Sequence, residues 1–221
     1  MRPTLRWKTP TAWAAAVLAD PLALLADHAH CEMGAASTAQ TLIARHPGEP
    51  ILVDALAALA SEELRHFRRV HRLLAELGGE LPPIGQNPYA GALVRAVDRK
   101  SPTALFDRLI VSALIEERSH ERFEMLAAAC FQDAASRCGE EEANVSEMIG
   151  KLFSDLLSSE AGHARLFLDL AERLFPEEDL AARLASWEER EAEGIRSLAF
   201  SYRVHSGPPE SVPGPQGWGT A

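Results

Sequence analysis

The chain has 221 residues, 47% hydrophobic and 24% charged, the balance of a globular protein, and no stretch approaches the roughly 18 apolar residues of a membrane-spanning helix. Its three cysteines, Cys31, Cys130 and Cys138, form no CxxC pair, which excludes a disulfide scaffold and a zinc finger. Because the sequence shows no apolar signal peptide, we expect a cytoplasmic protein and no membrane partner. The formal charge of −10 arises in residues 140–193, which carry 15 acidic and 5 basic side chains, so the acidic total does not exclude a basic patch elsewhere.

Seven helices are predicted along the chain, and proline and glycine fall mostly between them. Asp20-Pro21 and Ser101-Pro102 each place a capping side chain before a proline, which is the pattern of a helix start. Gly78-Gly79 is typical of a helix end, and a long connection containing Asn87-Pro88 follows it. The predicted helices cover about residues 11–18, 21–46, 49–77, 89–98, 102–136, 143–174 and 176–202.

Four of these helices are long, and they are joined by short turns except for one longer crossover between the second and the third. This order predicts an all-α protein with a ferritin-like four-helix bundle, short accessory helices and an additional C-terminal helix. We expect a single domain over residues 1–205 and an irregular tail rich in proline and glycine over residues 206–221. Trp7, Trp13 and Trp187 are expected to pack in the core.

Two ExxH motifs lie in matching positions of two long helices. Glu63 and His66 form the first, Glu160 and His163 form the second, and the two pairs are separated by the same offset of 97 residues. Three residues are slightly less than one helical turn, so each Glu and His project from one face, and in both helices that face is apolar. A buried carboxylate without a partner costs several kcal/mol, so two such pairs indicate a bound cation.

A dinuclear centre in a bundle needs one further carboxylate from each of the other two long helices. On the first long helix, Glu32 is surrounded by alanines and other small residues. On the third, Glu116 and Glu117 compete, and we choose Glu116 because the face of Glu117 turns toward Glu121 and Glu124. Glu117 and His120 formally make a third ExxH.

The predicted metal ligands are therefore Glu32, Glu63, His66, Glu116, Glu160 and His163. Four carboxylates and two imidazoles suit iron or manganese better than zinc. From spacing alone, an oxidase, a monooxygenase, a peroxidase, a manganese catalase and an iron-storage ferroxidase all remain possible. The remaining histidines are expected at the surface or with a hydrogen-bond partner: His28, His30, His46, His71 and His205.

Several segments resemble the bacterial 2-methylthio-isopentenyladenosine tRNA hydroxylase family. They are His30-Cys31-Glu32, Ser61-Glu62-Glu63-Leu64-Arg65-His66-Phe67, Asn87-Pro88-Tyr89-Ala90, Ile115-Glu116-Glu117-Arg118-Ser119-His120-Glu121-Arg122-Phe123, and Ser159-Glu160-Ala161-Gly162-His163. The resemblance implies a hydroxylase that uses two iron ions and molecular oxygen to hydroxylate the isopentenyl group of a modified adenosine beside the tRNA anticodon. It also implies that Glu116 is the ligand on the third long helix. Electrons would come from an external reductase or ferredoxin, since the chain has no flavin or nicotinamide fingerprint.

A tRNA substrate requires basic side chains near the active site. Candidates for tRNA contact are Arg65, Arg68, Arg69, Arg72, Arg95, Arg99 and Lys100, although these residues could equally form a solvated face. Arg118 and Arg122 could instead be hydrogen-bonding partners of the metal ligands. Two other functions remain open: a ferritin-like di-iron or di-manganese oxidoreductase that acts on a small molecule or peroxide, and a non-catalytic iron-binding bundle.

Overall fold

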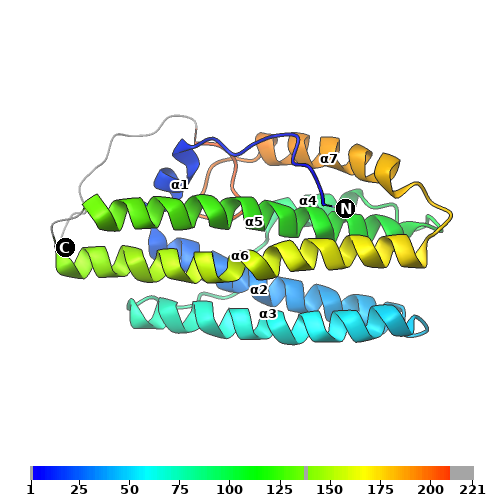
Figure 1. Ribbon diagram of the computed structural model, residues 1–221, viewed down its shortest axis with the longest axis horizontal. Coiled ribbons are helices and arrows are strands. Elements are labelled where there is room, and N and C mark those ends of the chain that lie inside the picture. The colour runs from blue at the N-terminus through cyan, green and yellow to red at the C-terminus, as the bar shows by residue number, and fades with distance from the viewer. Residues whose placement is uncertain (1, 137–138, 210–221) are drawn as a thin grey trace.

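The computed structural model describes residues 2–136 and 139–209, and all regular structure in them is α-helical, as predicted. Seven helices occur in these residues, of which four are long (Figure 1). Their bounds are α1 Ala12–Val17, α2 Pro21–Arg45, α3 Pro50–Glu76, α4 Pro88–Ala96, α5 Ala104–Ser136, α6 Glu140–Leu174 and α7 Leu180–Ser197. In these residues, no helix is long and apolar enough to span a membrane.

The helix ends follow from local residues, with one correction. Asp20 caps α2 by accepting a hydrogen bond from the Ala23 amide, and α3 stops before Gly78, whose φ of 78° favours glycine. The last helix was predicted over residues 176–202 but is shorter at both ends. Asp179 caps its start, and after Ser197 the chain leaves the helix and runs back toward the bundle.

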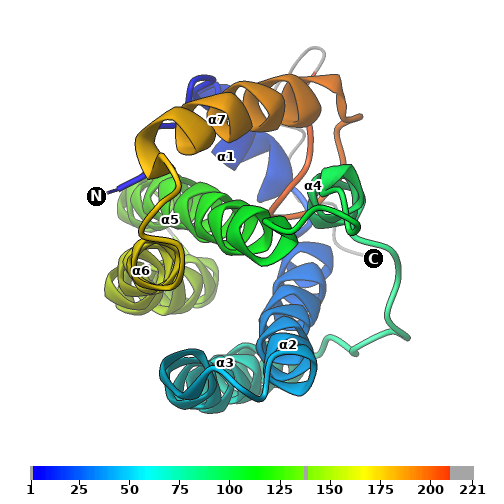
Figure 2. The ribbon, with the colours of Figure 1, turned by 90° about the vertical axis from the view of Figure 1, so that its right-hand side faces the viewer.

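The bundle consists of two helix pairs, α2 with α3 and α5 with α6, joined by the crossover that carries α4 (Figure 2). Its interior is two apolar clusters, one around Leu56, Leu109 and Leu168, the other around Leu25, Phe153 and Leu126. Along every long helix the chain passes from one cluster to the other. Between the clusters lies a layer of buried charged residues.

The outer face of α5 is covered by α1 and α7 (Figure 2). Trp13 and Trp187 are buried as expected, and Trp7 is half-buried against the core. Beyond α7 the chain folds back, so that Val204, His205 and Ser206 are buried. Gly207 is buried too, and a Cβ there would lie 1.6 Å from the Leu198 carbonyl oxygen. Of the predicted tail, residues 210–221 lie outside the described residues.

Candidate metal centre

The buried charged layer contains all six predicted metal ligands. Each is at most 7% exposed, and each long helix contributes at least one. They are Glu32 from α2, Glu63 and His66 from α3, Glu116 from α5, and Glu160 and His163 from α6. Apolar clusters border the layer at both ends, and the charged groups of the described chain besides the six that reach it are His28, which contacts Glu32, and Glu62, which lies near both histidines.

The six side chains form two sets of three. Glu32, His66 and Glu160 make one set and Glu63, Glu116 and His163 the other, and the ligand atoms of each set lie within 4.8 Å of one another. Each ExxH motif is divided, since its glutamate belongs to one set and its histidine to the other. Glu63 touches both histidines: its Oε2 is 3.3 Å from His66 Nδ1 and its Oε1 is 2.9 Å from His163 Nδ1. This arrangement provides two adjacent cation positions with carboxylates able to reach both.

The fit of cations can be tested on unpartnered atoms. Both carboxylate oxygens of Glu63, Nδ1 of His66 and both ring nitrogens of His163 are buried, and none has a hydrogen bond of good geometry within the described chain. The short distances between them are therefore contacts without a correctly directed hydrogen bond. Buried polar atoms are normally hydrogen-bonded, and a shared cation would satisfy these. The residues therefore fit a dinuclear metal site.

The pKa values of the carboxylates and histidines in the layer also indicate that it favours added positive charge. Burial, with the negative charge of neighbouring carboxylates, raises the pKa of Glu116 to about 8 and the pKa of Glu160 well above its usual range. Burial would lower the pKa of His66 and His163, but contacts with nearby carboxylates raise both to about 9. Without metal the layer holds protons in place of cations.

One of the six has a partner that the sequence pattern did not reveal. His28 Nε2 lies 2.5 Å from Glu32 Oε1, and the imidazole stacks on Phe153. Burial would raise the pKa of Glu32, but the hydrogen bond and charge of His28 lower it. The expectation for His28 was a surface position or a satisfied hydrogen bond; it is buried, and its partner is a predicted ligand. Its spacing of four residues before Glu32, one helical turn, was the available signal.

Glu117, the rejected alternative on α5, has other partners. Its Oε2 accepts a hydrogen bond from Arg2 Nε at 2.6 Å, and His120 contacts the Leu157 carbonyl at 3.0 Å. Neither belongs to the two sets. One residue along a helix is a rotation of about 100°, which separates Glu116 from Glu117.

A cavity of about 680 Å³ opens onto the layer between α2 and α5. Its floor includes Glu32, Glu63, Glu116 and Glu160, and much of its remaining wall is apolar, including Ala35, Ile115 and Phe167. The crossover and the C-terminal segment close it, the latter through Tyr202, Arg203 and His205. His205 stacks on Tyr89 and lies 3.1 Å from Ser119 Oγ, so this histidine is also buried and partnered.

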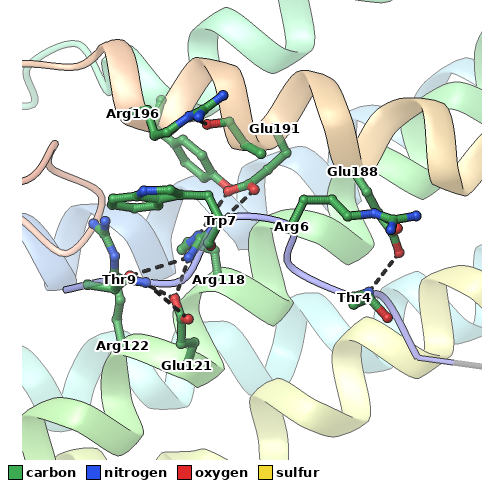
Figure 3. Close-up of polar contacts among 12 residues, drawn as sticks. Thr4, Arg6, Trp7, Thr9, Arg118, Glu121, Arg122, Glu188, Glu191 and Arg196 are labelled. Atoms are coloured by element: carbon green, nitrogen blue, oxygen red, sulfur yellow. Dashed lines mark hydrogen bonds and ion pairs between the residues drawn. The ribbon is translucent and has the colours of Figure 1, made fainter. Parts of the chain in front are cut away.

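Arg118 and Arg122 do not contact the predicted ligands, contrary to the expectation. Arg118 donates to both oxygens of Glu191 on α7 and also contacts Thr9, Glu121 and the Trp7 carbonyl (Figure 3). Arg122 donates to the carbonyls of Val204 and Ser206. Arg118 lies two positions after Glu116 and Arg122 lies six positions after it, which places both on the opposite face of α5. They fix the N-terminal segment, α7 and the C-terminal segment.

Comparison with known proteins decides the family. The model of the tRNA-(ms2io6A)-hydroxylase (MiaE) family matches residues 1–206, nearly all of the chain. The chain belongs to the MiaE family. Members of this family are tRNA hydroxylases, so the protein is an enzyme by descent, and tRNA is the substrate that its family implies.

Relatives agree with this assignment. The tRNA 2-(methylsulfanyl)-N(6)-isopentenyladenosine(37) hydroxylase of Pseudomonas putida is 38% identical over 204 residues, with 92% of each chain covered. The enzyme of the same name from Salmonella typhimurium is 34% identical over 158 residues, 72% of this chain and 53% of that protein. A solved structure, "Protein 43 with aldehyde deformylating oxygenase activity" from Synechococcus, has a TM-score of 0.78 at 33% identity and covers 92% of this chain and 96% of that one.

A MiaE enzyme must bring tRNA to the cavity, so the placement of its basic residues matters. The seven residues predicted to contact tRNA are all exposed, and none lines the cavity. Arg69 pairs with Asp155 at 2.7 Å, whereas Arg95 lies against Gly91, which does line the cavity. The basic residues that line it, Arg108 and Arg203, were missed, because their burial depends on contacts between distant segments.

Proposed function

We propose that this protein hydroxylates the isopentenyl group of 2-methylthio-isopentenyladenosine beside the anticodon of tRNA. The observation that carries the proposal is the pair of buried Glu/His sets opening onto a mostly apolar cavity, in a chain that belongs to the MiaE family. A prenyl group is apolar and fits such a cavity, while the carboxylate floor would place its carbon atoms beside the metals. Because tRNA is the substrate, we place the enzyme in the cytoplasm.

Two iron ions are the proposed cofactor. Glu32, His66 and Glu160 would hold one and Glu63, Glu116 and His163 the other, and Glu63 contacts the histidines of both sets. Oxygen-rich ligation with a single imidazole for each ion suits iron or manganese better than zinc, and the oxygen chemistry of the proposed reaction favours iron. When bound, the pair of ions supplies the activation of molecular oxygen needed to oxidise an unactivated carbon–hydrogen bond.

The protein's own contribution is positioning and shielding. His28 orients the Glu32 carboxylate, and the two apolar clusters border the ligand layer at both ends. The apolar cavity wall excludes water from the reacting carbon. Electrons would come from an external reductase or ferredoxin, because the sequence contains no flavin or nicotinamide fingerprint.

The test combines genetics and reconstitution. Nucleoside mass spectrometry of tRNA from cells with and without the gene should show the hydroxylated nucleoside only when the gene is present. Purified protein loaded with Fe²⁺ and given a chemical reductant and oxygen should convert anticodon stem-loop RNA carrying the prenylated adenosine. If the modified RNA stays unreacted while the iron-loaded protein consumes oxygen, the substrate assignment is wrong.

A small-molecule oxygenase is the second candidate, favoured by the structural match to the Synechococcus protein with aldehyde deformylating oxygenase activity. The largely apolar cavity would also accept an aliphatic aldehyde. The same reconstituted protein should therefore be assayed with such an aldehyde, and conversion of the aldehyde but not of the RNA would favour this candidate. A non-catalytic iron-binding bundle would convert neither.

A further inference from the structure

One arginine of the cavity, unlike Arg118 and Arg122, makes no hydrogen bond or ion pair with any residue of the described chain. Arg108 lines the cavity from α5, and its Nη1 atom is buried without a hydrogen-bond partner. No carboxylate in the described chain pairs with it, although Asp107 is its neighbour in sequence. Asp107 instead accepts hydrogen bonds from Arg183 and from the Trp187 indole. Arg108 therefore presents a guanidinium to the cavity without a counter-charge from the protein.

The contrast with Arg118 and Arg122 is informative. Arg118 pairs with Glu191. Arg122 has one unpartnered nitrogen, Nε, but its two terminal nitrogens donate to backbone carbonyls and its guanidinium lies over the Trp13 ring. A partly buried cation without an anion is unfavourable, and two more cations increase the cost here. Arg45 at the end of α2 and Arg99 after α4 lie close enough that their charges, added to the larger effect of burial, lower the pKa of Arg108 to about 10. Neither has an ion pair within residues 2–136 and 139–209.

The placement of Arg108 relative to the buried charged layer suits the binding of a nucleotide that reaches from one to the other. Arg108, Ser112 and Glu116 follow one another at four-residue intervals on one face of α5, and all three line the cavity. Eight residues of helix span about 12 Å, so the backbone position of Arg108 lies about two turns from that of the predicted metal ligand. A prenylated nucleotide has the same order: the reacting methyl group at one end, then the purine and sugar, then a phosphate.

We propose that Arg108 binds a backbone phosphate of the modified nucleotide and thereby positions its prenyl group over the metal layer. This inference rests on the proposed function, because it takes the substrate to be RNA. An arginine fork matches the geometry of a phosphate, and anticodon-loop nucleotides are single-stranded and can be turned outward into a pocket. Arg45 and Arg99 attract the same backbone from outside the cavity. Arg108 is thus a positioning residue and not a catalytic one.

Two substitutions test the proposal by binding. Arg108→Gln should weaken binding of the prenylated anticodon stem-loop about 10- to 100-fold, the usual effect of losing one charged hydrogen bond. It should also reduce the slope of log K against log salt by about 0.7, the share of one phosphate on a single strand. Arg108→Lys keeps the positive charge but loses the two-pronged guanidinium, so its affinity for the stem-loop should lie between those of the parent protein and Arg108→Gln. Arg173→Gln, on the exposed end of α6, is the matched control and should match the parent protein.

Turnover of small substrates separates this proposal from the proposed function. With iron-loaded parent protein, the 3′- or 5′-monophosphate of the prenylated nucleoside should have a lower KM than the free nucleoside. Arg108→Gln should abolish that difference in KM. The kcat for the free nucleoside, which has no phosphate, should change little. If the parent protein hydroxylates the RNA but Arg108→Gln keeps the parent affinity and phosphate preference, the proposal for Arg108 is wrong. If the parent protein hydroxylates none of these substrates, the proposed function fails instead.

Misfolding is excluded by a stability measurement. Arg108 has no partner to lose within the described chain and is repelled by two other arginines, so Arg108→Gln should melt at the same temperature as the parent protein or higher. A marked fall in melting temperature would mean that Arg108 supports the fold, and it would overturn the functional assignment.

Discussion

His28 is the residue whose role depends most directly on one contact. Its imidazole holds Glu32 at 2.5 Å inside the bundle, whereas the other oxygen of Glu32 is 3.5 Å from His66. His28→Ala should leave the carboxylate free to rotate and weaken metal binding about 10- to 100-fold, the usual cost of losing a side chain that orients a ligand. Metal titration with a competing chelator measures this loss. His71→Ala, on the exposed face of α3, should bind metal as the parent protein does; equal affinity in both variants would remove His28 from the site.

Glu116 and Glu117 are adjacent in sequence and differ in environment. Glu116→Ala should lower the metal content and abolish oxygen-dependent product, because Glu116 belongs to one of the two ligand sets. Glu117→Ala removes only a contact with the exposed Arg2 side chain, so most activity should remain. Metal analysis and product formation measure both effects. The reverse ranking would require α5 to be rotated by about 100°.

The attachment of α7 to α5 depends on a buried ion pair. Arg118 and Glu191 are both fully enclosed and face each other (Figure 3). The hydroxyl of Tyr89 also donates to Glu191. Glu191→Ala would leave the Arg118 guanidinium buried and unpaired, so we expect it to lower the free energy of unfolding by about 3–5 kcal/mol. Urea denaturation measures the change. Glu193→Ala, two residues along and exposed, should change it by no more than about 0.5 kcal/mol.

The stability of the protein should depend on pH in opposite ways with and without metal. Glu116 and both site histidines have pKa values raised to about 8 and 9, so the metal-free folded state holds more protons than the unfolded state. The stability of the metal-free protein is therefore expected to fall as pH rises from about 5 to 9. Metal binding requires these protons to leave, so added Mn²⁺ or Fe²⁺ should stabilise more strongly as pH rises toward 8.

Thermal unfolding across this pH range, with metal present and after chelation, provides the comparison. A metal-free protein that became more stable between pH 6 and 9 would contradict the protonated ligand layer. A stabilisation by metal that did not change with pH would contradict the six residues as its ligands.

That the six Glu and His side chains gather in one buried layer could be predicted from the sequence, because local periodicity is enough to define their faces. Both ExxH motifs lie on apolar helix faces, so their convergence follows once the helices pack. The partners of Arg118 and Arg122 could not be predicted, because Glu191 and Val204 are 73 and 82 residues away in the chain. The isolation of Arg108 is also invisible in sequence, where Asp107 stands beside it. Contacts that depend on where distant segments meet have no local pattern.

The C-terminal segment has a consequence for the order in which the protein is made. Residues 200–207 are held on the bundle by hydrogen bonds with Trp13, Asp27 and Arg122, and they contribute Tyr202, Arg203 and His205 to the cavity wall. They leave the ribosome after all four long helices. The helices can therefore assemble their six carboxylate and imidazole groups while one side of the cavity is still open to solvent. Translation thus separates two events in time, the gathering of the metal-binding groups and the enclosure of the chamber above them. In a nascent chain, the six side chains can thus come together before the cavity can exclude water from a reaction.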